Sequence, residues 1–158
     1  MKKIEKELWT KKDDFCFGCS EKNPIGLKLD FYDMGDYIET QWLPNKNYEG
    51  WQGVLHGGII ATLLDEIGGW VVVSKIGIAG MTVELNVRYH KQISSNQLLT
   101  LRGKLVDIKK NIAFIQAEII QNDIVKASGI SKYFLFDQKT SREQYQVINN
   151  NLKSIENN

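Results

Sequence analysis

The feature that most constrains the fold is a proline-free segment of helix-forming residues that runs from Ile59 to about Lys75 and ends at Gly77. At about 100° per residue, its large apolar side chains gather on one side of a helix. These residues are Ile60, Leu63, Ile67, Trp70 and Val71. The segment therefore predicts one long helix that buries this side against a sheet.

The opposite side of the predicted helix carries Asp65 among small residues. These are Gly58, Ala61, Thr62, Gly68 and Gly69. A helix face left to water normally carries long polar side chains, and each glycine within a helix costs about 1 kcal/mol relative to alanine. We therefore expect a second subunit or a ligand to approach this face closely, with Asp65 at the contact. The alternative is a surface carboxylate beside a packing seam.

Alternating polarity predicts strands on both sides of the helix. Leu27 to Phe31 and Tyr37 to Leu43 flank Met34-Gly35-Asp36, which indicates a hairpin. After the helix, the strand from Met81 to His90 should place Leu85 and the other odd-numbered residues on one face, with Thr82 on the other. Further strands are expected at 99–105, 112–121 and 124–136, so that about four strands form an antiparallel meander.

The length and charge of the chain indicate one compact domain. The chain has 158 residues and a formal net charge of +1, which disfavours a nucleic-acid binder. No apolar stretch reaches the length of a membrane span, and the N-terminus lacks an apolar signal core, so a cytoplasmic protein without a membrane partner is expected. Residues 1–14 predict a surface helix, residues 15–137 the domain, and residues 138–158 a frayed polar tail.

The two cysteines form the sequence Cys16-Phe17-Gly18-Cys19. Such a pair is either half of a zinc site or a redox pair. Zinc would require two more ligands, but the two histidines, His56 and His90, are distant in sequence. A turn at residues 23–26 also departs from the strand–motif–helix order of thioredoxin-like proteins. We therefore expect a structural or incidental role for the pair, with no metal and no cofactor.

His56-Gly57-Gly58 precedes the helix. The free N–H groups at a helix start can hold a developing oxyanion. Asp65 lies two turns further along, about 11 Å of helix rise, which is too far for both groups to act on one carbonyl within one chain. A symmetric dimer would solve this, because the Gly57 end of one helix could face Asp65 of the other.

The spacing of His56-Gly57-Gly58 to Asp65, followed by the strand that begins at Met81-Thr82-Val83-Glu84, resembles the hotdog-fold acyl-CoA thioesterases. The resemblance covers about residues 15–136 and is strongest to the group typified by the phenylacetate-degradation thioesterase. It implies the α+β hotdog fold, in which a curved antiparallel sheet of about five to six strands wraps one long central helix. It also implies homodimers and often homotetramers.

The resemblance assigns a role to each residue of this motif. Asp65 would act as general base toward water or as nucleophile, the Gly57 N–H would polarise the thioester carbonyl, and His56 would orient the thioester. Thr82, from the partner subunit, would support the acid or the water. The chain departs from some relatives at Gly50 and Gly69, where those relatives carry hydrogen-bonding side chains. Gly58 and Gly69 are predicted to border the substrate, whereas Glu66 should point away as an ion-pair or rim residue.

The sequence thus predicts a thioester hydrolase that acts on acyl-CoA. Because CoA carries three phosphates, basic residues are expected near the site. Arg88 and Lys91 are the predicted substrate-binding residues, and the other basic candidates are Lys109, Lys110 and Lys132. A non-catalytic acyl-CoA sensor on the same fold is the alternative. A hotdog dehydratase is a third reading, although the motif differs from the dehydratase signature.

Overall fold

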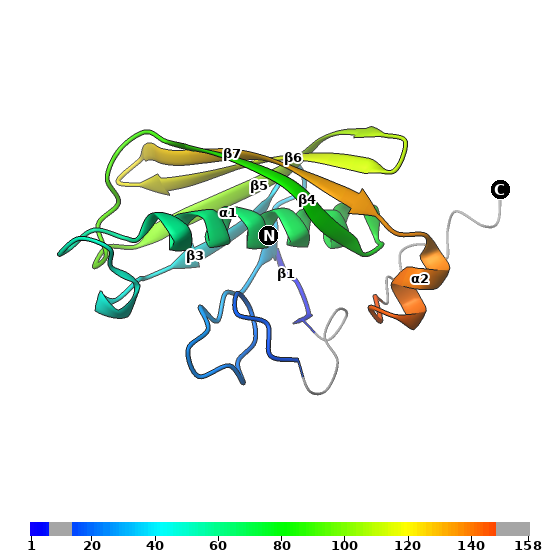
Figure 1. Cartoon of the computed structure of the whole chain (residues 1–158), viewed down its shortest axis with the longest axis horizontal. Helices are drawn as coiled ribbons and strands as arrows, with labels where there is room; N and C mark the ends of the chain where they lie inside the picture. The colour runs from blue at the N-terminus through cyan, green and yellow to red at the C-terminus, as the bar shows by residue number, and fades with distance from the viewer. Residues whose placement is uncertain (7–13, 148–158) are drawn as a thin grey trace.

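In the computed structural model, which describes residues 1–6 and 14–147, a curved antiparallel sheet packs against one long helix (Figure 1). The strands are β1 Lys2–Lys3, β2 Tyr32–Asp33, β3 Ile38–Trp42, β4 Gly80–Tyr89, β5 Leu99–Lys109, β6 Ile112–Gln121 and β7 Ile124–Leu135. The helices are the 3-10 turn η2 Lys46–Tyr48, the α-helix α1 Gly57–Val71, its π-helical continuation η3 Val72–Ile76, and α2 Gln138–Glu143. The predicted hotdog architecture is confirmed.

The seven strands form a single sheet in the order β1-β2-β3-β5-β6-β7-β4. The sheet exceeds the predicted five to six strands because two short strands, β1 and β2, extend one edge. The predicted four-strand meander is wrong in one respect. β5, β6 and β7 are consecutive hairpins, but β4 pairs with β7 and not with β5. Residues 90–98 instead lead the chain across to the far side of the sheet, where β5 pairs with β3.

The long helix follows the prediction closely. It ends at Gly77, which adopts a left-handed φ of 83° that favours glycine. The five apolar residues expected to face the sheet are all buried, but Trp70 packs against the segment on the other side of α1 and not against the sheet. Phe31 stacks on Trp70 with ring centroids 4.8 Å apart. The segment that carries Phe31, residues 14–31, covers the side of α1 turned away from the sheet (Figure 1).

The predicted strand from Leu27 to Phe31 is wrong, because only Tyr32–Asp33 joins the ladder with β3. The backbone N–H groups of Leu27 and Leu29 donate to the carbonyls of Phe17 and Gly18, so this segment pairs with the cysteine loop and not with β3. The predicted turn is confirmed at Gly35, where φ is 94°. The segment therefore fixes the cysteine loop in place.

Both chain ends differ from expectation. Lys2–Lys3 forms strand β1 where a surface helix was predicted, because the edge of β2 offers backbone groups to pair with; residues 7–13 of that predicted helix lie outside the described residues. The tail is not frayed at its start, since Asp137 caps α2 and Val147 is buried against Val73 and Ala79. Residues 148–158 lie outside the described part. No helix among the described residues is long and apolar enough to cross a membrane.

Candidate active site

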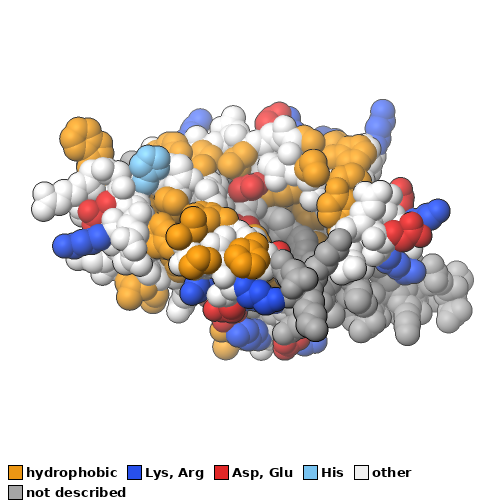
Figure 2. All heavy atoms as spheres, turned by 60° about the horizontal axis from the view of Figure 1, so that its bottom comes forward, with side chains coloured by type: hydrophobic (Ala, Val, Ile, Leu, Met, Phe, Trp, Pro, Cys, Tyr) orange, Lys and Arg blue, Asp and Glu red, His pale blue; other side chains and the backbone are white. Residues whose placement is uncertain are grey.

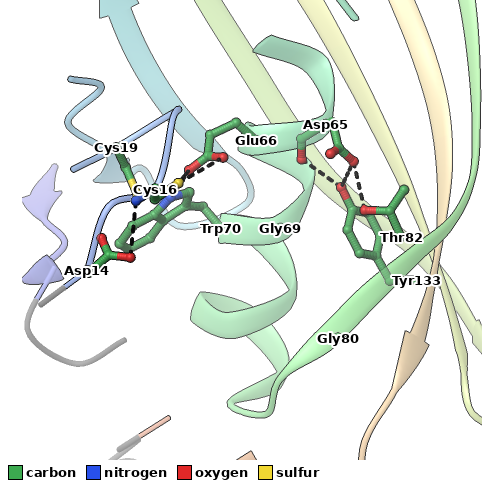
Figure 3. A pocket seen from close by; sticks show the side chains of 10 residues that line it. All are labelled: Asp14, Cys16, Cys19, Asp65, Glu66, Gly69, Trp70, Gly80, Thr82 and Tyr133. Atoms are coloured by element: carbon green, nitrogen blue, oxygen red, sulfur yellow. Dashed lines mark hydrogen bonds between the residues drawn. The ribbon is translucent and has the colours of Figure 1, made fainter. Parts of the chain in front are cut away.

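Asp65 projects from the middle of α1 toward two strands of the sheet (Figure 3). Its Oδ1 accepts hydrogen bonds from Thr82 Oγ1 at 2.8 Å and from the Tyr133 hydroxyl at 3.0 Å. The Tyr133 hydroxyl also lies 2.6 Å from the Asp65 carbonyl oxygen, so its proton is shared between two acceptors. None of the described residues donates to Oδ2. The carboxylate is thus oriented through one oxygen while the other is available.

Burial keeps Tyr133 as a hydrogen-bond donor to Asp65. Burial, followed by the charge of Asp65, raises the pKa of Tyr133 well above its ordinary value. The phenol therefore keeps its proton and its hydrogen bond to Asp65. The sequence analysis missed this residue. The only signal was the run of small residues at the inward positions of β7, Ala127, Gly129 and Ser131, which ends in this large side chain.

A β-bulge in β4 brings Thr82 to Asp65. Thr82 pairs with Tyr133 and Glu84 pairs with Lys132, so the strand register shifts at Val83. An extra residue in one strand reverses the alternation of side chains beyond it. Thr82 therefore faces α1 on the same side as Leu85, which corrects the prediction that the two lie on opposite faces.

The hydrogen bond between Thr82 and Asp65 also corrects one expectation drawn from the resemblance. Thr82 was implied to act from the partner subunit, but its hydrogen bond to Asp65 lies within one chain. Thr82 sits on β4, which follows α1 directly and runs along it, and the bulge turns its hydroxyl toward the helix. Each chain therefore carries its own acid with both supporting hydroxyls.

Two glycines beside Asp65 differ in what surrounds them. A Cβ at Gly68 would overlap the Tyr133 hydroxyl, so glycine here lets Tyr133 reach Asp65. At Gly69 a Cβ would meet no atom of residues 1–6 or 14–147 within 4 Å. We predicted that a partner or ligand approaches this helix face closely. At Gly68 the approaching group is Tyr133 of the same chain, whereas the space beside Gly69 is open.

His56 caps the start of α1. Its Nδ1 accepts a hydrogen bond from the Gly58 N–H at 2.9 Å, which assigns the ring proton of neutral His56 to Nε2. None of the described residues accepts a hydrogen bond from the Gly57 N–H, and the Tyr89 hydroxyl donates to the Gly57 carbonyl at 3.0 Å. A Cβ at Gly50 would lie 3.2 Å from the His56 ring, so this departure from relatives leaves room for the histidine.

The predicted site residues form two groups in one chain. Asp65 and Thr82 meet in the middle of α1, whereas His56, Gly57 and Gly58 lie at its start, as the spacing predicted. Arg88 and Lys91, the predicted phosphate ligands, are exposed. Neither forms an ion pair with the described residues, whereas Lys132 pairs with Glu84 and Lys109 with Asp107. Arg88 and Lys91 are thus available to an anionic ligand.

A cavity of about 270 Å³ adjoins Asp65 and extends to the cysteine loop (Figure 3). Its lining residues are Asp14, Cys16, Cys19, Asp65, Glu66, Gly69, Trp70, Gly80, Thr82 and Tyr133. Glu66 corrects a second prediction, because it is not an ion-pair or rim residue. It accepts hydrogen bonds from Trp70 Nε1 at 3.1 Å and from Cys16 Sγ at 3.5 Å. Enclosure by these groups raises the pKa of Glu66.

Comparison with known proteins shows which family this chain is similar to. Residues 52–128 match the model of the thioesterase superfamily. No curated protein matches the sequence. A solved thioesterase superfamily protein is 29% identical, with a TM-score of 0.65, and the match covers 69% of this chain and 57% of that protein. The chain thus spans little more than half of the length of this relative.

Two further solved structures share the fold. A hypothetical thioesterase from Streptococcus pneumoniae with coenzyme A is 24% identical, with a TM-score of 0.65 over 70% of this chain and 87% of that protein. A phenylacetic acid degradation-related protein from Ralstonia eutropha JMP134 is 17% identical, with a TM-score of 0.63 over 70% of this chain and 86% of that protein. Residues 52–128, which contain α1 with Asp65 and strand β4, therefore match the thioesterase superfamily, and the chain has the hotdog fold.

Proposed function

We propose that the protein is an acyl-CoA thioesterase that hydrolyses a thioester to a free carboxylic acid and CoA. The observation that carries this proposal is the arrangement of Asp65, whose Oδ1 is held by Thr82 and Tyr133 while Oδ2 receives no hydrogen bond from the described residues. An oriented carboxylate beside a cavity is suited to proton abstraction or to nucleophilic attack. The solved relative that contains coenzyme A supports the substrate class.

The reaction follows from this geometry by one of two routes. As a general base, Asp65 takes a proton from water, and the resulting hydroxide attacks the thioester carbonyl carbon. The negative oxygen of the tetrahedral intermediate accepts a hydrogen bond from the Gly57 N–H. The C–S bond then breaks, and the departing thiolate takes the proton from Asp65. As a nucleophile, Asp65 instead forms a C–O bond to the carbonyl carbon while the C–S bond breaks and CoA leaves as a thiolate. Water then cleaves the acyl anhydride to the carboxylic acid and free Asp65, and the proton released from water goes to the thiolate.

The site is complete only in a dimer. Within one chain, Gly57 and Asp65 are separated by about 11 Å of helix rise, which prevents both from contacting one carbonyl. Strand β4 is the last strand in the sheet order, so one of its edges is unpaired among the described residues. Met81 and Val83 on this strand are more than half exposed, and hydrophobic side chains gather on the face shown in Figure 2.

Long, apolar edge strands invite pairing with another chain. A homodimer formed across β4 would bring the Gly57 end of one helix toward Asp65 of the other and create two equivalent sites. Such dimers can pair again into a tetramer. Light scattering measures the mass of the assembly in solution. We expect at least a dimer, and a fully active monomer would contradict the shared site.

Recognition of the nucleotide part of CoA is assigned to Arg88 and Lys91, which are exposed and lack an ion pair among the described residues. If they contact phosphates, the KM for acyl-CoA should rise with salt more than the KM for an acyl-pantetheine analogue. Replacing both residues with glutamine should remove this difference. Equal salt dependence for the two substrates in the wild type would contradict the assignment.

The experiment that tests the function is a thiol-release assay with short-chain, long-chain and aromatic acyl-CoAs, combined with binding of a non-hydrolysable acyl-CoA analogue. We expect release of free CoA from at least one class, with turnover well above the rate in buffer. Binding of the analogue without hydrolysis of any class would contradict the proposal and identify an acyl-CoA sensor. The same panel identifies the preferred acyl group.

A further inference from the structure

Cys16, Cys19 and Glu66 form a compact cluster on the side of α1 opposite Asp65 (Figure 3). One potential ligand atom from each of the three residues lies within 4.8 Å of the others. Cys16 Sγ is 3.5 Å from one carboxylate oxygen of Glu66 and 3.6 Å from the other. Both cysteines are free thiols, and Cys19 is only 4% exposed. Two sulfur atoms and one carboxylate thus share one enclosed space.

Among the described residues, no cation lies beside the enclosed carboxylate of Glu66. No lysine, arginine or histidine among the described residues forms a salt bridge with Glu66, and its donors are Trp70 Nε1 and the thiols. An enclosed carboxylate is costly unless a positive charge or a proton neutralises it. The two thiols cannot supply a positive charge, and they add further negative charge when they ionise. A bound cation would neutralise all three groups together.

The cysteine loop is shaped to receive Glu66. A Cβ at Gly18 would overlap the Glu66 carboxylate, so the glycine between the cysteines is what admits this side chain. The backbone hydrogen bond from Ser20 to Cys16 closes the loop as a tight turn, and the pairing with residues 27–29 holds it. The loop therefore holds both sulfur atoms close to the Glu66 carboxylate.

We propose that Cys16, Cys19 and Glu66 bind one thiophilic divalent cation, Zn²⁺, with the fourth coordination position open to the cavity. Zinc forms bonds of about 2.3 Å to sulfur and about 2.0–2.2 Å to oxygen. The three ligand atoms would close in from their separations of up to 4.8 Å by small side-chain rotations. On binding, each thiol and any protonated carboxyl releases its proton to water, and the cation replaces these protons.

Trp70 would support the ligand set from outside. Its Nε1 donates to Glu66 Oε1, which orients the carboxylate and leaves Oε2 for the metal. The proposal replaces the expectation of no metal, because the third ligand is 47 residues beyond Cys19 and meets it only in the folded chain. The metal would connect residues 14–31 to α1 one residue from Asp65. It is a structural connection, since Asp65 hydrolyses the thioester without it.

The test is metal binding by the full chain, purified under reducing conditions and treated with a chelator. Titration with Co²⁺ should produce the near-ultraviolet absorption of cobalt–thiolate bonds with one Co²⁺ per chain, and Zn²⁺ should displace it. Zinc should also raise the melting temperature of the wild type relative to the chelated protein, because a ligand that binds only the folded state stabilises it. This second measurement requires no variant.

Three variants assign the ligands. Cys16→Ser and Cys19→Ser should each abolish the cobalt–thiolate spectrum or weaken binding at least tenfold, and Glu66→Gln should weaken zinc binding at least tenfold. Asp65→Asn is the matched control, because it removes the neighbouring carboxylate, and it should bind zinc as the wild type does. Reduced wild type that binds no zinc, or zinc retained by the serine variants, would overturn the proposal. Undiminished affinity in folded Glu66→Gln would overturn it as well.

Discussion

Asp65 and Glu66 are adjacent carboxylates on one helix, yet the two sides of α1 surround them with opposite chemistry. Asp65 faces β4 and β7, which supply the hydroxyls of Thr82 and Tyr133. Glu66 faces residues 14–31, which supply two thiols and enclose it. Residues one apart on a helix point about 100° away from each other, so each meets a different layer of the fold. The layer, and not the residue type, determines what each acid can do.

The hydroxyl side leaves one carboxylate oxygen open to a substrate, whereas on the thiol side Trp70 Nε1 and the Cys16 thiol contact the carboxylate of Glu66. We therefore assign turnover to the first side and cation binding to the second.

Asp65→Asn should lower kcat at least ~10²-fold, because it keeps the size of the side chain but removes the base or nucleophile. Binding of a non-hydrolysable acyl-CoA analogue should stay within a few-fold of wild type. Asp14→Asn, which changes an acid on the other side of the same cavity, is the control and should retain most activity. Normal hydrolysis by Asp65→Asn would show that catalysis does not depend on the side of α1 that carries Asp65.

Thr82→Val and Tyr133→Phe should each lower kcat about tenfold with little change in KM. Each removes one hydroxyl that orients Asp65, and a hydrogen bond to a charged group contributes about 1.5–3 kcal/mol. The matched control is Tyr37→Phe, since Tyr37 lies near Arg102 and away from Asp65. Steady-state kinetics with one acyl-CoA is sufficient. Unchanged kcat in both variants would show that the hydroxyls do not position the acid.

The two helix glycines give a matched pair for stability. Gly68→Ala should lower the free energy of unfolding by about 1–3 kcal/mol, because its Cβ overlaps the Tyr133 hydroxyl. Gly69→Ala should raise it by up to about 1 kcal/mol, since alanine favours the helix and no atom of the described residues lies within 4 Å of its Cβ. Urea denaturation measures both. Equal losses would show that the open space at Gly69 is filled in the assembled protein.

A further expected effect on stability appears at alkaline pH. Because burial raises the pKa of Tyr133, the folded chain keeps a proton that the unfolded chain loses above about pH 10. The free energy of unfolding of wild type should therefore fall by up to about 1.4 kcal/mol for each pH unit above 10, relative to Tyr133→Phe. Parallel pH profiles for the two proteins would contradict the buried, protonated phenol.

Local patterns in the sequence were sufficient for the helix, the last two strands and the spacing of Gly57 to Asp65. Periodicity reports which face of an element is buried, and Ile60, Leu63 and Ile67 of α1 are buried as predicted. It does not report a bulge, so Thr82 was assigned to the wrong face of β4. It also does not report which distant segments meet.

For the same reason the sequence did not indicate Tyr133, and it placed Glu66 wrongly at the rim. Tyr133 reaches Asp65 only because β7 crosses the helix at Gly68, and Glu66 reaches the cysteines only because residues 27–29 hold their loop against α1. Each contact joins residues 47 or more positions apart. Such contacts depend on how elements pack, which the alternation of polar and apolar residues leaves open.

The division of roles along α1 can be examined in one crossed measurement, in which kcat and bound zinc are determined on the same samples of Asp65→Asn and Glu66→Gln. Asp65→Asn should bind one zinc per chain and lose at least ~10²-fold in kcat. Glu66→Gln should lose zinc affinity at least tenfold and keep kcat within a few-fold of wild type. If Glu66→Gln loses as much kcat as Asp65→Asn, the two sides of the helix form one catalytic site and the assignment of separate roles is wrong.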